Sequence, residues 1–355
     1  MRLSRPACGL SICAMLGFGM FATAWAGEAT NPVDPSSANL LQELRQYPHK
    51  LIYESNRDGN WELYVCNADG SNPVNLTRTP DVDELFPRPS PDGSRICFVA
   101  DEGTGNAKVR NLYYMNADGS GRTRIADNAR EPCWSPGGQQ IAFMKGETDR
   151  FLCSNFATKG LFIYDLRTGK TRQHSNRELI HLANLNWTPD GMWFIATVHG
   201  GLGYAHSNLA IEVTGDRIID LKLDGCRPNV RRDGRMICWN HGDFAAGVAD
   251  LDLESWAPKA INVHDVVESS DPTEIYHTNW SPDGRYIAFA TGPKLQTKSL
   301  MGAMCEFPGV VAPGWNICVA DPMQKNQWRQ ITLDGKSCKF PNWILASDVS
   351  VKATR

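Results

Sequence analysis

Beyond its first 26 residues, the sequence lacks any apolar run long enough to cross a membrane. It also lacks an excess of positive charge, because residues 27–355 carry 34 basic and 39 acidic side chains, a net charge of −5. A nucleic-acid partner would need a basic face, so this class of ligand is excluded. No Gly-x-Ser-x-Gly, His-x-His or His-Glu-x-x-His spacing occurs. The sequence therefore has no signature of a serine hydrolase domain or of a closely spaced metal centre.

The first 26 residues have the pattern of a secretory signal peptide. Arg2 and Arg5 form a short basic head, residues 7–23 are apolar or small, and residues 24–26 (Ala-Trp-Ala) form a small-x-small cleavage site. The apolar stretch is too short and too rich in glycine for a good membrane span, which favours cleavage over an uncleaved anchor. We therefore expect a periplasmic or secreted protein with no membrane span and no lipid anchor.

A Trp-Ser-Pro-Asp-Gly motif followed by an apolar alternation recurs along the chain. In the copy at 276–292, Ile287 and Phe289 alternate with Ala288 and Ala290, the period of two that is typical of a strand. Asp-Gly reverses the chain because Gly accepts a positive φ, and Pro presets φ on the way into the turn. Each copy therefore predicts a hairpin. Related copies lie at 86–99, 132–144 and 185–198, with a degenerate copy at 228–240.

A second hairpin motif, built on Ala-Asp-Gly, follows the first at 60–77 and 110–126, with weaker forms at 160–174 and 315–332. One full period is thus four antiparallel strands, and successive periods are 43 to 53 residues apart. This is the repeat length of a β-propeller blade. Internal repetition therefore defines the fold class before any single site is considered.

Six periods occur, so the sequence predicts an all-β fold, a six-bladed β-propeller of four-stranded antiparallel blades. The chain begins with the second strand of a blade near Leu51 and ends with a surplus first strand at 340–345. We expect this C-terminal strand to join the first blade and close the ring, which protects the sheet edges. The predicted divisions are a signal peptide (1–26), an N-terminal leader (27–46), the propeller (47–345) and a C-terminal tail (346–355).

The repeat resembles that of TolB-type, WD40-like propellers. The residues that carry the resemblance are Pro-x-Trp-Ser-Pro-Asp-Gly-x-x-Ile-Ala-Phe followed by x-Leu-Tyr-x-x-Asn-Ala-Asp-Gly-Ser, and the likeness is strongest in blades 1, 2, 3 and 6. Related repeats occur in propeller domains of some peptidases and in oligogalacturonate lyases. TolB itself has an α/β domain before its propeller, and we expect that domain to be absent because only about 20 residues precede the first strand. The resemblance implies the fold, which hosts many functions.

Strand order predicts which loops share a face of the propeller. The first-to-second and third-to-fourth strand turns lie on one side and are short Asp-Gly turns. The longer, more varied loops lie on the other side, which we call the crossover face. They include the insertions 145–160 and 291–314 and the crossovers 77–86 and 264–277. Ligands of rigid scaffolds are usually held by such variable loops, so we expect binding at the crossover face.

Histidines of three adjacent blades map to this crossover face. We expect four of them to surround the mouth of the central channel, where neutral imidazoles could bind a divalent metal or one could act as a base. Spacing before the recurring Trp position places further polar side chains at the same level, with Phe340 as the equivalent in the last strand. The alternative is that these histidines are only solvated or locally hydrogen-bonded. The candidate ligand-binding residues are His181, His199, His241, His277, Arg227, Glu274, Glu131 and Asn184, and the candidate metal ligands are the four histidines.

Nine cysteines remain after signal-peptide cleavage, an odd number in a compartment that permits disulfides. The chain is large enough to bury a core without them, so any bridge is an addition to the framework. The pairs that lie in neighbouring segments of one blade or crossover are Cys305 with Cys338 and Cys133 with Cys153.

Two functions from different classes remain open at this point. The first is an exported, non-catalytic binding module that holds an envelope protein or a glycan, as a monomer and with no required cofactor. The second is an enzyme, a lyase or related activity on an acidic oligosaccharide, because the oligogalacturonate lyases that the repeat resembles use a histidine-rich metal site on such a face. Convergence of the histidines would favour the second function.

Overall fold

The computed structural model describes residues 35–254, 256–270, 272–294 and 304–346. The expected signal peptide (1–26), the first part of the leader and the tail beyond residue 346 lie outside these residues. Within the described ranges, no helix is long and apolar enough to cross a membrane.

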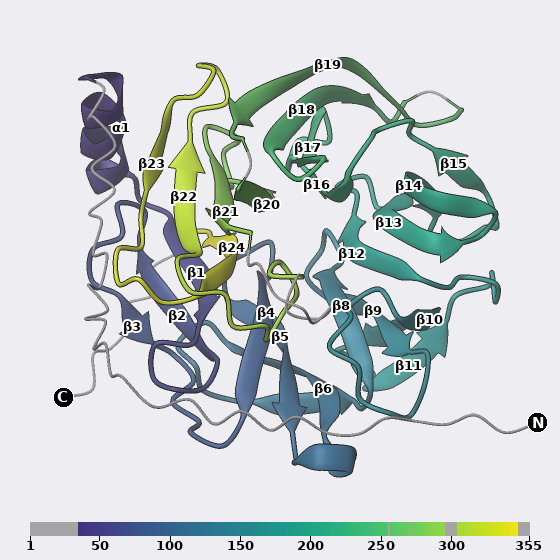
Figure 1. Ribbon diagram of the computed structural model, residues 1–355. Helices are drawn as coiled ribbons and strands as arrows, with labels where there is room; N and C mark the ends of the chain where they lie inside the picture. Colours follow the sequence, from purple (N-terminus) through teal and green to yellow (C-terminus); the bar gives the residue numbers. More distant parts are fainter. Residues whose placement is uncertain (1–34, 255, 271, 295–303, 347–355) are drawn as a thin grey trace, which may run out of the picture. The chain divides into compact units, whose positions relative to one another are not determined.

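Six four-stranded antiparallel sheets form a ring, as the repeats predict (Figure 1). The first strand of each blade contacts the first strands of its neighbours around the axis, so these six strands form the inner wall. From inner to outer strand, the blades are β24 (Cys338–Ile344), β1 (Lys50–Ser55), β2 (Glu62–Asn67), β3 (Val74–Asn75); β4 (Asp83–Pro89), β5 (Arg95–Glu102), β6 (Val109–Asn116), β7 (Thr123–Ala126); β8 (Ala129–Trp134), β9 (Gln140–Gly146), β10 (Thr158–Asp165), β11 (Lys170–Gln173); β12 (Leu182–Trp187), β13 (Trp193–Gly201), β14 (Tyr204–Glu212), β15 (Ile218–Asp220); β16 (Cys226–Val230), β17 (Met236–His241), β18 (Ala245–Asp252), β19 (Lys259–Glu268); and β20 (Thr273–Trp280), β21 (Ile287–Pro293), β22 (Asn316–Ala320), β23 (Trp328–Gln330).

The C-terminal strand closes the ring, which confirms the prediction from the surplus strand. β24 pairs antiparallel with β1, with Trp343 opposite Leu51. β1 therefore gains a partner on its inner side, and the first blade is built from both ends of the described chain. This arrangement removes an exposed sheet edge at the point where the ring begins and ends.

The repeated Ser-Pro-Asp-Gly turn has the same hydrogen bonds wherever it occurs. In the last blade the Gly284 amide donates to the Ser281 carbonyl at 2.9 Å, and Asp283 accepts from the Arg285 amide at 3.1 Å. Gly284 has a φ of +73°, which disfavours any residue with a side chain. Beyond the turn, Ile287 packs into the core between two blades while its strand neighbour faces the adjacent core. The motif thus encodes both the reversal and the two packed faces of a blade.

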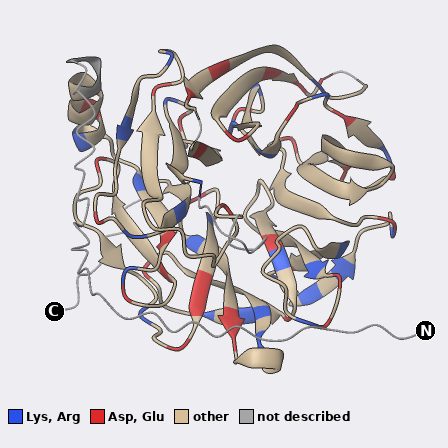
Figure 2. Ribbon diagram, viewed as in Figure 1, with Lys and Arg blue, Asp and Glu red and all other residues tan. Residues whose placement is uncertain are grey.

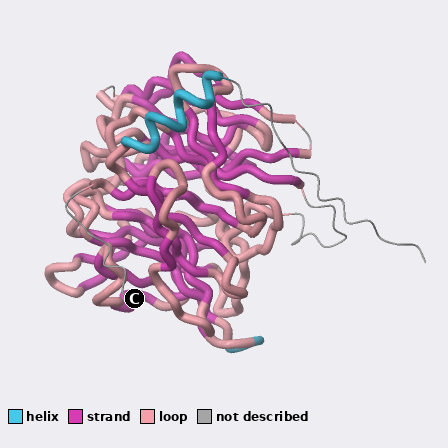
Figure 3. Tube along the Cα trace, turned by 90° about the vertical axis from the view of Figure 1, so that its left-hand side faces the viewer, coloured by secondary structure: helices cyan, strands magenta, loops and turns pink. Residues whose placement is uncertain are grey.

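The leader contains a helix that the sequence analysis did not predict. α1 (Pro35–Gln46) runs beside β23, the outermost strand of the last blade (Figures 1 and 3). Leu40 and Leu44 are buried in the same core as Trp343, and Tyr47 meets the ring of Trp343 edge-on at 5.6 Å. This helix therefore extends the hydrophobic core at the closure blade. A short 3-10 helix, η1 (Gly105–Ala107), lies in the β5–β6 loop.

Candidate functional site

Every inner strand carries one β-bulge at the same level. The register shifts in each pairing with the second strand of the blade, and each bulge contains a residue in the left-handed region, with φ between 50° and 62°. Bulges re-aim side chains locally, and positive φ in residues other than glycine is uncommon. We call these six residues the bulge ring: Phe86, Glu131, Asn184, Arg227, His277 and Phe340. Five were placed in register from the spacing before the recurring Trp position, and the same rule would have identified Phe86.

The bulge ring fills the channel instead of lining an open mouth. His277 stacks on Phe340 with ring centroids 3.7 Å apart, and Phe86 packs against Phe340 at 4.9 Å. The guanidinium carbon of Arg227 lies 5.6 Å from the Phe340 ring, and its Nη1 donates to Asn184 at 3.4 Å. The space left among these residues is about 10 Å³, roughly what one water needs. The expected site for a small polar ligand at this level is therefore a packed layer.

The polar members of the bulge ring are bonded to the protein itself. Glu131 accepts hydrogen bonds from the Asn155 side chain at 2.8 Å and from the Asn184 amide. Burial raises the pKa of Glu131, and these hydrogen bonds oppose that shift. His277 Nε2 lies 2.8 Å from the Glu306 carbonyl oxygen, while Nδ1 has no partner among the described residues. Burial, and then the positive charge of Arg227, holds the pKa of His277 well below its usual range, so the imidazole is neutral.

The segment 304–314 covers the crossover end of the channel. Lys339, on inner strand β24, is fully buried and donates from Nζ to the carbonyls of Cys305 at 3.0 Å, Val310 at 2.8 Å, and Phe307. Phe307 also meets the ring of Phe156, from the β9–β10 insertion, at 5.7 Å. The described parts of the two insertions that we expected to be ligand loops therefore pack over the channel and against each other, and residues 295–303 of the insertion 291–314 lie outside the described residues.

The side chains of the four candidate metal histidines each contact different partners. His181 Nδ1 lies 2.8 Å from the Gly200 carbonyl, and its Nε2 lies 3.3 Å from Glu147. His199 stacks on Phe156, and burial, then the neighbouring His206, lowers its pKa to about 3. His241 pairs with Asp265 at 2.8 Å, and His277 belongs to the bulge ring. Within the ranges that the structure describes, no three His, Cys, Asp or Glu side chains are placed to hold a metal ion.

Glu274 is a buried carboxylate on the crossover side of β20. Burial, then the charges of Glu306 and Asp243, raises its pKa to about 7. Lys294 Nζ lies 3.7 Å away, and Tyr276 donates its hydroxyl to Asp243. The Glu274 carboxylate is therefore part of a local polar network beside the bulge ring.

The cysteines chosen for disulfides are not bridged as expected. Cys133, Cys153 and Cys338 are free thiols in the structure, so neither Cys133–Cys153 nor Cys305–Cys338 is formed. Cys338 Sγ lies 3.4 Å from the Ser55 hydroxyl, and Cys133 packs in an apolar core between blades. Burial raises the pKa of Cys133 to about 12, which keeps it a thiol.

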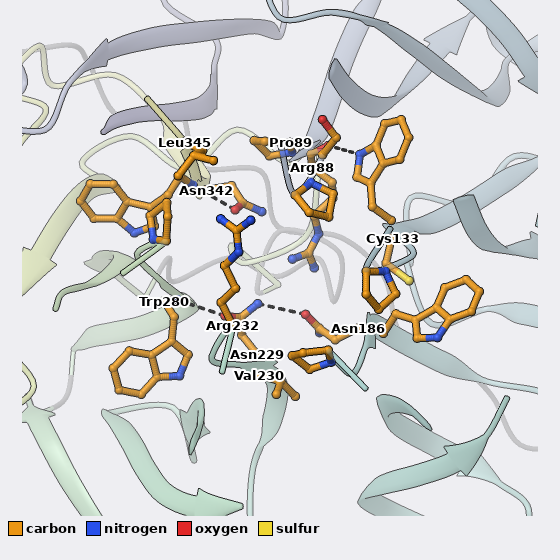
Figure 4. A pocket seen from close by; sticks show the side chains of 18 of the residues that line it. Arg88, Pro89, Cys133, Asn186, Asn229, Val230, Arg232, Trp280, Asn342 and Leu345 are labelled. Carbon is orange, nitrogen blue, oxygen red and sulfur yellow. Dashed lines mark hydrogen bonds between the residues drawn. The ribbon is translucent and has the colours of Figure 1, made fainter. Parts of the chain in front are cut away.

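A second cavity lies at the opposite end of the channel, on the face of the short turns. Its volume is about 350 Å³, and it is walled by inner-strand ends and by the Ser-Pro-Asp-Gly turns of the repeat (Figure 4). We call it the turn-face mouth. Its lining includes the basic Arg88 and Arg232, the amides Asn186, Asn229 and Asn342, the rings Trp134, Trp187, Trp280 and Trp343, the hydroxyls Ser90 and Ser281, and the rim residues Pro91, Pro136, Pro189, Pro282, Val230 and Leu345.

Hydrogen bonds between blades hold the wall of the turn-face mouth in place. Asn229 donates to Asn186 at 2.9 Å and accepts from the Trp280 amide at 3.0 Å. One level in, Arg88 Nη1 donates to Asn279 at 3.3 Å, and Asn279 donates to the Pro341 carbonyl at 2.8 Å. Each bond joins different strands or blades, so the mouth is preformed.

Both charged side chains that line the turn-face mouth are positive. Arg232 and Arg88 both extend toward its centre, and no Asp or Glu is among the lining residues (Figure 4). Neither guanidinium has a carboxylate within 4.0 Å in the described part of the chain. Elsewhere basic and acidic residues are interspersed over the blades (Figure 2). Desolvation lowers the pKa of Arg88, which nevertheless stays charged because an arginine ionises far above neutral pH.

Sequence reasoning missed this site because it assigned the short turns to folding alone. A signal was present in the degenerate repeat at 228–240, where Arg232 occupies the position that Pro91, Pro136, Pro189 and Pro282 hold in other blades. A cation in place of the turn proline gains nothing for the hairpin. Arg232 instead extends into the turn-face mouth.

Comparison with known proteins agrees with the repeat and the fold. No protein-family model matches the chain. A Protein TolB homolog of Chlorobaculum tepidum is 31% identical over 108 residues, covering 29% of this chain and 24% of that protein. A second Protein TolB homolog, of Chlorobium luteolum, is 33% identical over 163 residues, covering 34% and 35%. The matches thus span about a quarter to a third of the length of these curated relatives.

Among solved structures, a chain of Kuenenia stuttgartiensis hydrazine synthase is similar with a TM-score of 0.58 and 11% identity, over 87% of this chain and 48% of that one. At this identity the likeness concerns the fold alone. The repeat motifs, the six closed blades and the matches to TolB homologs agree with one another. The chain is therefore a six-bladed β-propeller whose repeat is similar to that of TolB homologs.

Proposed function

We propose that this chain is an exported binding module that holds a segment of a partner protein in its turn-face mouth. The observation that carries the proposal is the preformed cavity of about 350 Å³, within the roughly 300–1,000 Å³ usual for ligand sites, whose two charges are both positive. Export rests on the signal-peptide pattern of residues 1–26. The sequence similarity to proteins named TolB homologs supports a TolB-like role in binding other proteins.

A protein segment suits the turn-face mouth better than a glycan does. Sugars stack on exposed aromatic faces, but Trp134, Trp280 and Trp343 are only 7%, 6% and 4% exposed. Trp187, the fourth tryptophan of the lining, is partly exposed and packs against Phe194 with ring centroids 4.6 Å apart. The rim instead offers prolines and Leu345, which can contact an extended chain, with polar amides and arginines below. The packed bulge ring beneath the mouth provides a closed floor.

Site-specific photo-crosslinking tests this function in the native compartment. A photoreactive residue at Leu345, on the rim, should give an adduct of discrete mass whose partner is identified by mass spectrometry. The matched control places the same residue at Val311, which is 50% exposed in the segment that covers the crossover end. The identified partner is then purified, and its affinity is compared between the wild-type chain and Val230→Trp, which fills the turn-face mouth. Adducts from Val311 alone, or unchanged affinity of Val230→Trp, would place binding elsewhere.

A further inference from the structure

The turn-face mouth presents hydrogen-bond donors to whatever enters it. Arg88 has several N–H groups beyond the one that bonds Asn279, and Arg232 points into the same space (Figure 4). Asn342 accepts from the Trp343 amide through its oxygen, which leaves its NH₂ group as a further donor at the wall. A cavity with donors, two positive charges and no acidic lining favours an anionic group, because charge-assisted hydrogen bonds are about twice as strong as neutral ones.

The two cations lie at different levels of the turn-face mouth. Arg88 belongs to the inner level, two residues beyond the bulge-ring position Phe86, where it also packs over the Phe86 ring at 4.7 Å. Arg232 belongs to the outer level, at the turn of its blade. A ligand that satisfies both therefore extends from rim to floor and carries negative charge at more than one point.

The rim of the turn-face mouth is mostly apolar, with Arg232, Ser90 and Ser281 as polar residues of the turns. Prolines from four blades and Leu345 surround the opening, and a bare oxyanion would leave this surface unused. The cavity is also many times larger than the space that one water needs. A peptide chain uses both parts, because its backbone and side-chain carbons contact the rim while its carboxylates reach the arginines.

We propose that the turn-face mouth recognises an acidic peptide segment, whose side-chain carboxylates bind Arg88 at the floor and Arg232 at the rim. This inference rests on the proposed function and names the chemistry of the bound segment. Recognition combines charge-assisted hydrogen bonds from two guanidinium groups with apolar contact to the proline rim. The packed bulge ring limits how deep the segment can enter.

Isothermal titration calorimetry with short peptides tests the recognition of carboxylates. The probe is an end-blocked Gly-Asp-Glu-Asp-Gly peptide, and its matched control is Gly-Asn-Gln-Asn-Gly, which has the same shape without charge. We expect the uncharged peptide to bind at least about tenfold more weakly, and the acidic peptide to lose affinity as salt rises. Equal binding of the two peptides would overturn the inference.

Three variants locate the interaction on the protein. Arg232→Gln and Arg88→Gln should each weaken binding of the acidic peptide by about threefold to tenfold. Arg235→Gln is the matched control, because Arg235 lies in the same turn as Arg232 but lines an outer groove instead of the mouth. It should leave affinity unchanged. Thermal unfolding verifies that each variant is folded, and Arg232 is exposed enough that its loss should not affect folding. Equal weakening by all three would indicate general charge attraction and overturn the inference.

Two further measurements distinguish the acidic peptide from other possible ligands of the turn-face mouth. Inorganic phosphate that binds as tightly as the acidic peptide, with the same dependence on Arg88 and Arg232, would identify a small-anion site. Residues 347–355 follow closely after Leu345 in the sequence and contain Asp348, so the chain's own tail is the other competitor. Binding of the peptide only after deletion of 347–355 would assign the mouth to the tail. Either result would overturn the inference.

The crosslinking experiment distinguishes this inference from the proposed function. A partner adduct at Leu345 that persists unchanged in Arg232→Gln and Arg88→Gln would leave the binding module in place and refute the role of carboxylates. Absence of any adduct at Leu345 in the wild-type chain would refute the binding function itself.

Discussion

Replacing His277 by alanine should destabilise the protein strongly, although the sequence alone places this histidine among ligand-binding candidates. Its side chain is only 2% exposed, and its ring stacks on Phe340 at 3.7 Å. Its Nε2 lies 2.8 Å from the Glu306 carbonyl oxygen, which ties inner strand β20 to the segment 304–314. Alanine removes both the stacking and the hydrogen bond.

The size of the effect follows from these contacts. Removing a large buried ring typically costs about 3–5 kcal/mol, and the imidazole is smaller than the rings in that series. The lost hydrogen bond adds about 1 kcal/mol. The positive φ of 62° is at least as unfavourable for alanine as for histidine, so relief of backbone strain does not offset the loss. We therefore expect His277→Ala to lower the free energy of unfolding by about 3 kcal/mol.

Denaturant unfolding near pH 7.5 measures this loss, with His264→Ala as the matched control. His264 is exposed and bonds only the nearby Asn262 carbonyl among the described residues, so its loss should cost less than about 0.5 kcal/mol. The pH dependence gives a second, independent readout. Because the pKa of His277 is held well below 6.5 in the folded state, the unfolded state binds an extra proton at lower pH and wild-type stability falls.

The alanine variant has no such proton to bind, so the difference in stability should shrink by about 1.4 kcal/mol per pH unit below 6.5. A loss of less than about 1 kcal/mol at neutral pH, as for a surface change, would refute the packed bulge ring. A difference that does not change with pH would refute the buried, neutral state of His277.

Three further predictions concern closure of the ring, the buried carboxylate of Glu54 and the helix α1. Deleting residues 338–355 removes β24 and exposes β1, so size-exclusion chromatography and thermal unfolding should show aggregation or loss of the cooperative transition, and an unchanged stable monomer would contradict closure by this strand. Burial raises the pKa of Glu54 to about 7, so the wild-type protein loses stability as pH rises from 4.5 through 7 and this carboxyl group ionises. The free energy of unfolding of Glu54→Gln should therefore rise relative to that of the wild type by up to about 3 kcal/mol between pH 5 and 8. Parallel stability curves of the two proteins would contradict this. Leu44 is fully buried between α1 and the ring, so Leu44→Ala should cost about 3 kcal/mol in denaturant unfolding while the exposed control Gln42→Ala costs almost nothing; equal, small effects would mean that α1 is not part of the core.

The repeat alone was sufficient to predict the propeller. Strand alternation, the Asp-Gly reversal and the Pro before it are local properties, because each depends on residues within one hairpin. Counting the repeats predicted six blades, and the surplus strand around Trp343 predicted closure. α1 escaped this reasoning because its apolar residues are few and it is stabilised by contact with a blade that is distant in sequence.

The spacing of the repeat predicted that the bulge-ring residues share one level of the channel, but it did not predict what surrounds them. Whether Arg227, His277 and Phe340 line an opening or fill it depends on the distance across the channel and on the segment 304–314, which the repeat does not encode. The histidines of the crossover face were grouped by topology, yet they bond to separate partners, since the positions of side chains on one face are set by packing between blades. Sequence fixes which strand a residue occupies and which face it turns to. The tertiary structure decides what meets it there, because contacts at the channel axis join strands that are some 40 to 250 residues apart in the chain.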